Sequence, residues 1–230
     1  MYCFESDHGC SVFAVHSGEH TYFGRNMDMF PEYKKTSESV LYMPENQNIF
    51  LAHSTAMICV EDGMNEHGLA AALTFLLPKT VKPGINGGFL IRLILEECKT
   101  AEEAARLLQN IPISSVHNIV VADSMGEMFV AECTAEQVSV RWCEKYTAAT
   151  NHFITPEMQR YNAEDENWYQ TRDRLATLES VLVDEHMTFD DIVQGICNEA
   201  LERKVELNEI CNNRYGCFCD FYDIRSDYLF

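Results

Sequence analysis

The sequence predicts an α+β fold in four layers, an αββα sandwich in which two antiparallel β-sheets pack face to face and helices cover both outer faces. Three observations predict this arrangement. The strand-like segments come in groups instead of alternating singly with helices, as they would in a βαβ protein. Pairs of helical segments separate these groups. One strand-like segment, residues 68–77, is apolar at nearly every position, which is typical of a strand covered on both faces.

The first group of strands occupies the N-terminal third of the chain. A turn at Ser17, Gly18 and Glu19 joins its first two members, because Ser and Gly favour turns and strand-like runs flank them. Shorter apolar runs then lead to the long apolar strand. The group comprises residues 10–16, 20–25, 40–43, 56–60 and 68–77.

Two helices follow this group of strands. Apolar side chains at positions 90, 91, 93, 94 and 95 predict a largely buried helix over residues 87–97. Thr100 and Glu103 have the spacing of a capping box, which predicts the start of a second helix over residues 101–109. Pro112 closes the region.

The second half of the chain repeats the order of strands, helices and strands. Its first strands form a meander with turns at Ser124–Gly126 and near Glu144. The meander comprises residues 118–122, 128–133, 138–142 and 147–150. Helices over residues 166–182 and 188–203 follow, and strands over residues 215–222 and 227–230 end the chain.

Length and charge exclude several classes of protein. A chain of 230 residues with 47% hydrophobic residues is predicted to be a single globular domain. Its 36 acidic and 17 basic residues give a net charge of −19, which argues against nucleic acid and anionic membranes as partners. We find no apolar window of about 18 residues, and the segment MYCFESDHG lacks the features of a secretory signal. We therefore expect a cytoplasmic protein that does not span a membrane; a homo-oligomer is compatible with the sequence.

The ten cysteines are predicted to be reduced thiols, because the chain is long for a disulfide-stapled domain and has no recognisable signal. Cys211, Cys217 and Cys219 come nearest to a metal pattern. Their spacing fits no paired CxxC site, and no histidine lies nearby to complete one. We expect neither a metal nor another cofactor.

Cys10 is the residue with the clearest chemical potential. Gly9 precedes it and a strand-like run follows it, which by itself also fits a buried cysteine in an edge strand. If the chain is cut before Cys10, one residue supplies both nucleophile and base. The thiol is a good nucleophile, and a free α-amine with a pKa of about 7.7–8.0 can take its proton.

Five segments in order carry a family resemblance. They are Gly9-Cys10, Gly24-Arg25-Asn26-Met27-Asp28, Gly63-Met64-Asn65-Glu66-His67-Gly68-Leu69-Ala70, Thr150-Asn151-His152, and Arg214-Tyr215-Gly216 with Tyr222-Asp223. In these segments the chain resembles the N-terminal-nucleophile cysteine hydrolases of the acyl-coenzyme A:6-aminopenicillanate acyltransferase and choloylglycine hydrolase (penicillin V acylase) group. The resemblance covers nearly all of residues 10–230 and implies the N-terminal-nucleophile hydrolase fold.

The resemblance also implies residue roles. Residues 1–9 would be a short leader removed by self-cleavage, and residues 10–230 the catalytic domain. Cys10 would be the nucleophile, Asn151 an oxyanion donor, and Asp28 a carboxylate near the nucleophile. Arg25 would hold Asp28 or favour the thiolate, and Arg214 would support the active site. Arg214 aligns only with a one-residue gap, and Arg172 and Arg174 compete for the arginine of the other branch. Thr74, Phe75 and Arg172 would contact substrate, with a second oxyanion donor from a backbone N–H near Thr74, where the choloylglycine branch has Asn.

The implied activity is hydrolysis or transfer of the acyl group of a small linear N-acyl amide through a thioester on Cys10. Aromatic residues predicted either to line an acyl pocket or to belong to the core are Phe50, Phe75, Phe89, Phe153 and Tyr161. Two alternatives stay open. One is a catalytically silent binding relative that keeps its leader. The other is a cysteine enzyme that pairs Cys10 with a histidine such as His16. Three of the candidate site residues also have a purely structural interpretation. Asp28 and Asn151 would then be turn residues, and Arg25 a solvated arginine at a strand end.

Overall fold

The fold was analysed in a computed structural model, which describes residues 9–18, 20–29, 36–54, 58–162, 167, 170–183 and 216–224. Two antiparallel sheets form its centre. The smaller sheet has the strand order β10-β1-β2-β11. Its members are β1 (Gly9–Ser17), β2 (His20–Met29), β10 (Tyr146–Ala149) and β11 (Gly216–Ile224). The strand β1, at whose start Cys10 lies, is therefore a central strand with partners on both sides.

The larger sheet has seven strands in the order β3-β4-β5-β6-β7-β8-β9, so every strand pairs with its neighbour in sequence. The bounds are β3 (Glu38–Tyr42), β4 (Phe50–Ser54), β5 (Asp62–Asn65), β6 (Ala70–Phe75), β7 (His117–Ala122), β8 (Met128–Cys133) and β9 (Val138–Cys143). Two helices, α1 (Gly87–Glu97) and α2 (Ala101–Asn110), interrupt this meander between β6 and β7.

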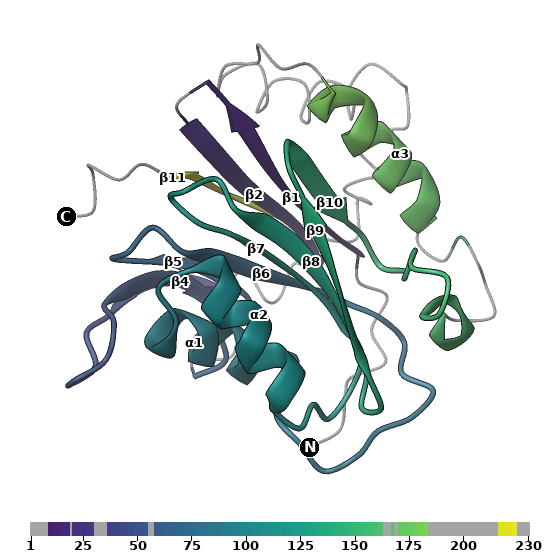
Figure 1. The fold of residues 1–230 in the computed structure, drawn as a ribbon, viewed down its shortest axis with the longest axis horizontal. Helices are drawn as coiled ribbons and strands as arrows, with labels where there is room; N and C mark the ends of the chain where they lie inside the picture. Colours follow the sequence, from purple (N-terminus) through teal and green to yellow (C-terminus); the bar gives the residue numbers. More distant parts are fainter. Residues whose placement is uncertain are drawn as a thin grey trace.

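The helices lie on the outer faces of the two sheets. Figure 1 shows α1 and α2 on the side of the larger sheet and α3 (Thr171–Leu182) on the opposite side, against β1 and β10. The four layers and the two antiparallel sheets confirm the predicted αββα class.

The alternation of side chains along each strand separates the layers. Val12 and Ala14 of β1 pack between the sheets with Ala70, Ala72 and Val120. Phe13 and Val15, one step out of phase, pack instead against Leu175, Leu178 and Leu182 of α3. Ala71 and Leu73 of β6 face α1 and α2. Whether a residue has an even or an odd number within its strand thus decides whether its side chain lies between the sheets or against the helices.

Helix starts follow from local chemistry. The side chain of Asn86 caps α1 by accepting from the N–H of Phe89, and Thr100 caps α2 by accepting from Glu103. The first residue of α1 is Gly87 for a steric reason. A Cβ there would lie 2.7 Å from Cε1 of His117, whose ring is packed under the helix start. At Gly18, in the predicted turn after β1, φ is +63°, a conformation that suits glycine.

Most predicted elements are present, with differences at particular positions. The predicted strand over residues 56–60 is wrong for its described part, residues 58–60, because the chain there connects β4 to β5. Those two strands were not predicted. Helix α3 begins at Thr171 instead of residue 166. The predicted helix over residues 188–203 and the strand over residues 227–230 lie outside the described residues.

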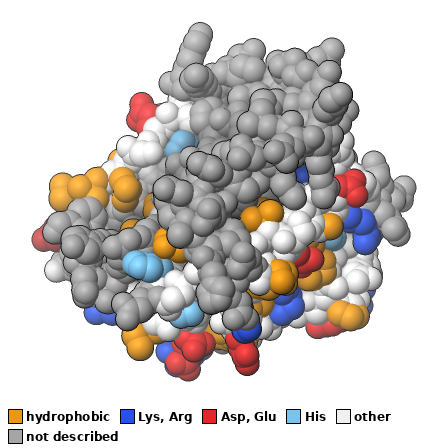
Figure 2. Space-filling view, turned by 90° about the horizontal axis from the view of Figure 1, so that it is seen from above, with side chains coloured by type: hydrophobic (Ala, Val, Ile, Leu, Met, Phe, Trp, Pro, Cys, Tyr) orange, Lys and Arg blue, Asp and Glu red, His pale blue; other side chains and the backbone are white. Residues whose placement is uncertain are grey.

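Two further observations concern the surface. On the face shown in Figure 2, the described acidic and basic side chains are interspersed, and the described residues form no broad basic patch there. Among the helices that the structure describes, none is both long and apolar enough to cross a membrane.

Candidate active site

Cys10 lies at the start of β1 with its side chain on the inter-sheet face, since it shares the parity of Val12 and Ala14. It is 3% exposed. Opposite it on β2 is Met27, and Gly9 is paired with Asp28. The Gly9–Cys10 peptide therefore lies within a paired strand. Among the described glycines positive φ values occur at Gly18, Gly68 and Gly126 but not at Gly9, which lies in β1, so the junction is extended and not left-handed.

The backbone of Cys10 is held by two side chains from distant parts of the chain. Its N–H donates to Oδ1 of Asn151 at 2.9 Å. Its carbonyl accepts from Nη1 of Arg174 at 2.7 Å, and the same nitrogen donates to Oγ of Ser11 at 2.8 Å. Asn151 follows β10 and Arg174 lies on α3, so the contacts of Cys10 join three elements of the smaller-sheet side.

The orientation of the Asn151 amide is fixed by its contacts. Oδ1 accepts from the N–H of Cys10 and, at 2.6 Å, from Nη2 of Arg174. With two donors on the oxygen, the nitrogen must lie on the other side, where Nδ2 donates to the carbonyl of Phe75 at 2.6 Å. An amide nitrogen carries two hydrogens. The second has no acceptor among the described residues, so it is available to a ligand oxygen.

The segment that carries Asn151 is bonded on both sides of the site. The N–H of Asn151 donates to Oγ1 of Thr171 at 2.7 Å, at the first residue of α3. The carbonyl of Thr150 accepts from Oγ1 of Thr74 at 2.6 Å. Thr74 is fully buried, and its hydroxyl is used by this contact. The predicted substrate contact of Thr74 stays a prediction, and its side chain holds protein backbone.

Arg25 projects from β2 into the space between the sheets. Its Nη2 lies 3.8 Å from Sγ of Cys10, close enough to place a positive charge beside the thiol. Its Nη1 is 2.8 Å from Asp62 Oδ2 and 3.4 Å from Glu61 Oε2, and Nε donates to the carbonyl of Leu73. Tyr222 donates to the other oxygen of Asp62 at 2.7 Å. Arg25 is thus a buried, fully engaged arginine, and its interpretation as a solvated residue is wrong.

The charge on Arg25 is secured by its neighbours. Burial alone lowers the pKa of a guanidinium, but the negative charges placed at Cys10, Asp62 and Glu61, and the hydrogen bond to Asp62, raise the pKa of Arg25 overall. The guanidinium is therefore positive at every physiological pH. A fixed positive charge therefore lies beside Sγ of Cys10.

The histidines near the site are poor bases. His152 is buried, and its Nδ1 is 2.9 Å from Oγ1 of Thr171. Burial, then the charges of Arg172 and Arg174, lower the pKa of His152 to about 4. His16 lies at the other end of β1 and contacts Thr21. Six residues of extended strand span about 20 Å, so the alternative that pairs Cys10 with His16 is wrong.

The remaining predicted site residues fall into three groups. Phe75 provides the carbonyl that binds Asn151, and its ring lies 6.4 Å from that of His117. Arg172 is on the exposed side of α3, whereas Arg174 is buried in the site. The backbone of Asp28 lies beside the junction, while its side chain and all of Arg214 lie outside the described residues.

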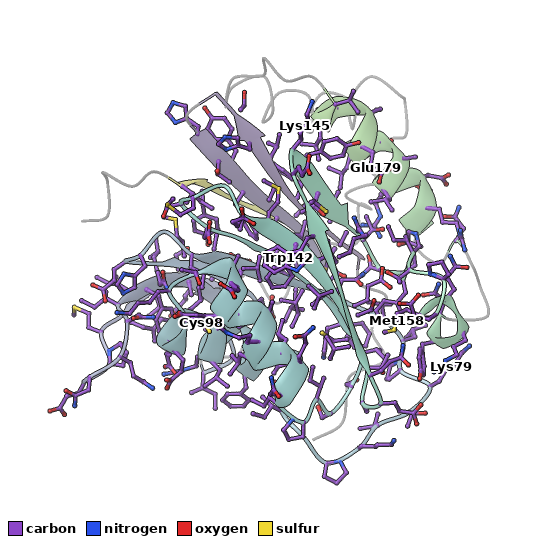
Figure 3. The ribbon with its side chains drawn as sticks, viewed as in Figure 1. Lys79, Cys98, Trp142, Lys145, Met158 and Glu179 are labelled. Atoms are coloured by element: carbon purple, nitrogen blue, oxygen red, sulfur yellow. The ribbon has the colours of Figure 1, made fainter. Side chains whose placement is uncertain are left out.

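Most of the aromatic residues considered for an acyl pocket serve other purposes. Phe50 belongs to the core under α1. Phe153 packs with Met158 in a separate buried cluster, against which Tyr161 is partly buried, and Figure 3 shows Met158 near the lower end of α3. Phe89 is partly buried on α1. Phe75 is the member of this set that directly contacts Asn151.

Three site residues were missed from the sequence. Asp62 binds Arg25 and accepts from Tyr222, but both residues are far from Arg25 along the chain, and the family resemblance placed Tyr222 only in the closing strands, without a role at the site. Glu61 is the third. The choice between Arg174 and Arg172 had no clear sequence signal, because Arg174 lies one helical turn before Leu178 and Arg172 lies one turn before Leu175, both of the buried stripe on α3.

Comparisons with known proteins agree with this geometry. No curated protein matches the sequence. A mutant of conjugated bile acid hydrolase from Clostridium perfringens superposes with a TM-score of 0.60 at 17% identity, covering 81% of this chain and 78% of that one. Penicillin V acylase from Agrobacterium tumefaciens gives a TM-score of 0.56 at 15% identity, with 82% and 71% covered.

A further similar structure is the Caenorhabditis elegans ortholog of N-acylethanolamine-hydrolyzing acid amidase. Its TM-score is 0.64 at 16% identity, with 91% of this chain and 92% of that one covered. At these identities the superpositions establish the fold, which is that of the N-terminal-nucleophile hydrolases. Residues 15–204 match the family described as Acyl-coenzyme A:6-aminopenicillanic acid acyl-transferase. Because this match spans most of the sequence, the chain belongs to the acyl-coenzyme A:6-aminopenicillanic acid acyl-transferase family.

Proposed function

We propose that the chain is a self-activating cysteine amidase or N-acyltransferase that cleaves a small linear N-acyl amide through an acyl-thioester on Cys10. The observation that carries this proposal is the environment of Cys10. A buried thiol lies beside a permanently charged arginine, and its backbone nitrogen is bonded to an amide that also has a free N–H. The thiol and the free amide N–H are two of the parts that acyl transfer requires, a nucleophile and an oxyanion donor, and a cut before Cys10 would supply the base as a free α-amine.

Activation would cut the chain between Gly9 and Cys10. The Cys10 thiol attacks the Gly9 carbonyl carbon, the peptide C–N bond breaks, and Gly9 becomes a thioester on Sγ. Water then hydrolyses that thioester, releasing residues 1–9 as an acid and restoring the thiol. The new α-amine stays at the former N–H position, where Oδ1 of Asn151 accepts its hydrogen bond.

Catalysis would use the same atoms. The α-amine takes the thiol proton, and the thiolate attacks the substrate carbonyl. The tetrahedral oxyanion accepts the remaining N–H of Asn151. Collapse breaks the C–N bond, and the α-ammonium returns its proton to the leaving amine. Water or a second amine then attacks the thioester and yields an acid or a new amide.

A second oxyanion donor is proposed at Phe75. The N–H of Leu73 donates to the carbonyl of Glu61 on the β5 side of β6. Because the direction of backbone groups alternates along a strand, the N–H of Phe75 faces the same edge, beyond the paired part of β5. Asp28, opposite Gly9 on β2, is proposed to bind the α-ammonium through its carboxylate.

The test is intact-mass spectrometry followed by acyl trapping. The purified protein should lack residues 1–9, and incubation with N-acyl amino acids, penicillins or bile-acid conjugates should add the acyl mass to the peptide that begins at Cys10. A protein that keeps residues 1–9 and forms no acyl adduct would instead be the catalytically silent binding relative.

A further inference from the structure

A row of polar side chains crosses the larger sheet opposite the smaller one. Thr74 of β6 is directly opposite Asn118 of β7, and Asn118 is directly opposite Glu132 of β8. All three are at most 1% exposed. They share the parity of Ala72, Val120 and Val130, which pack between the sheets. The row therefore points at the segment that leaves β10 and carries Asn151.

This row bonds the segment over residues 150–155 at successive points. Thr74 donates to the carbonyl of Thr150. Nδ2 of Asn118 donates to the carbonyls of Thr150 at 2.8 Å and His152 at 3.0 Å. The carboxylate of Glu132 accepts from the N–H groups of Ile154, at 2.9 Å, and Thr155. Asn118 is the central contact, and its two acceptors are the residues immediately before and after Asn151.

We propose that Asn118 is a positioning residue for the reaction, which acts by holding the backbone on both sides of Asn151. The inference rests on the proposed function, because it assigns Asn118 to the same oxyanion donor. With both flanking carbonyls fixed, the Asn151 amide keeps its place between Cys10, Arg174 and Phe75. Small displacements of such a donor cost large factors in rate.

The amide of Asn118 is poorly explained by stability alone. Its Oδ1 is buried without a hydrogen-bond partner among the described residues, and such an unpaired oxygen opposes folding. The two N–H groups, by contrast, are both used on backbone of the site. Asn118 thus leaves its Oδ1 without a hydrogen bond while its Nδ2 donates to two carbonyls of the site.

A matched control exists elsewhere in the fold. Asn48 is also buried, and its Nδ2 also donates to two carbonyls, those of Leu95 at 3.2 Å and Cys98 at 2.9 Å. These carbonyls belong to the end of α1, and Figure 3 shows Cys98 in the helical layer on the far side of the sheets from α3. Asn48→Leu removes the same kind of contact without touching the Asn151 segment.

The experiment compares Asn118→Leu with Asn48→Leu, with Asn118→Thr as a milder variant that keeps one hydroxyl donor. Both Leu variants should unfold at lower temperature. Asn118→Leu alone should lower kcat by about tenfold or more while KM changes less than about threefold. Hydrogen exchange over residues 150–155 should rise in Asn118→Leu and stay unchanged in Asn48→Leu.

Two results would overturn the inference. One is a kcat for folded Asn118→Leu, or for Asn118→Thr if the Leu variant fails to fold, that matches Asn48→Leu within about twofold. The other is unchanged exchange over residues 150–155. Failure of the proposed function can be told apart from failure of this inference about Asn118. In that case the wild-type protein itself would form no acyl adduct on Cys10. In that case the exchange measurement still decides whether Asn118 holds the segment.

Discussion

Arg174 donates to Oδ1 of Asn151 at 2.6 Å and to the carbonyl of Cys10 at 2.7 Å, so one guanidinium sets the relative position of the proposed nucleophile and the proposed oxyanion donor. The fork geometry of arginine allows both bonds at once. A lysine at this position has a single nitrogen and cannot reproduce the pair. Through this contact a residue on α3 fixes the backbone at the start of β1.

Arg174→Lys is therefore expected to keep its charge but lose turnover. We expect kcat to fall by about 10²-fold, because both Cys10 and Asn151 lose a fixed partner. Steady-state kinetics with the substrate found in the acyl screen would measure it. Arg106→Lys is the matched control, since that arginine is exposed on α2. Equal activity of Arg174→Lys and Arg106→Lys would show that Arg174 has no part in turnover.

Asn151→Ala tests the oxyanion donor itself. The fold should be retained, and kcat should fall by about 10²–10³-fold with a much smaller change in substrate binding. Circular dichroism would verify folding, and kcat and KM would be measured separately. A change in kcat below about threefold would be incompatible with the oxyanion role.

Cys10→Ala is expected to accumulate the full-length precursor. Without the thiol, neither the cut after Gly9 nor the acyl adduct can form. Intact mass reports the first, and trapping reports the second. Cys143→Ala is the control, because that thiol lies on β9, at the edge of the larger sheet, and contacts Arg141. The purified Cys143→Ala protein should lack residues 1–9, as the wild-type protein should.

The buried pair of Arg25 and Asp62 should make single substitutions costly. Asp62 is fully buried, so removing Arg25 leaves an uncompensated charge between the sheets. We expect Arg25→Met to lower the free energy of unfolding by about 3–5 kcal/mol, and a second change, Asp62→Leu, to recover part of it. Urea unfolding of both variants measures the difference. A double variant less stable than Arg25→Met would contradict this account.

Acid should destabilise the fold through His117. Burial lowers the pKa of His117 to about 4 from an ordinary value of 6.5, and neither ring nitrogen has a partner among the described residues. Above pH 6.5 both folded and unfolded states are neutral at this residue, so its contribution is intact. Between pH 6.5 and about 4 the unfolded state takes up a proton first, and stability falls as pH falls.

The loss through His117 should reach about 3 kcal/mol below pH 4. Urea unfolding at pH 7.5, 5.5 and 4.5 would follow it. His117→Leu should flatten the dependence, although His152, whose pKa is lowered in the same direction, would leave part of it. An unchanged slope in His117→Leu would mean that this ring does not titrate between folded and unfolded states.

Local signals account for the elements that the sequence predicts well. The helix over residues 87–97 coincides with α1, because a polar cap at Asn86 precedes a long apolar run. The strands β4 and β5 escaped prediction for physical reasons. β5 consists of Asp-Gly-Met-Asn, in which Asp, Gly and Asn favour turns, and only pairing with both neighbours makes it a strand.

The site likewise contains residues that short motifs predicted and residues that depend on tertiary packing. Cys10 and Asn151 were found through short motifs, and the structure brings them into contact. The ion pair of Arg25 with Asp62, and the choice of Arg174 over Arg172, depend on how sheets and helix pack. That information is distributed over side chains far apart in the chain, so short motifs do not contain it.

Chain ends usually fray, because their last residues lack neighbours that hold them. A cut after Gly9 would create an unusual end, since β1 is flanked by β2 and β10 and Cys10 is bonded to Asn151 and Arg174. The new amino group would form on a strand that is already paired within the folded sheet. Little ordering would then be needed when substrate arrives, and the enzyme's most reactive residue would also be among its best anchored.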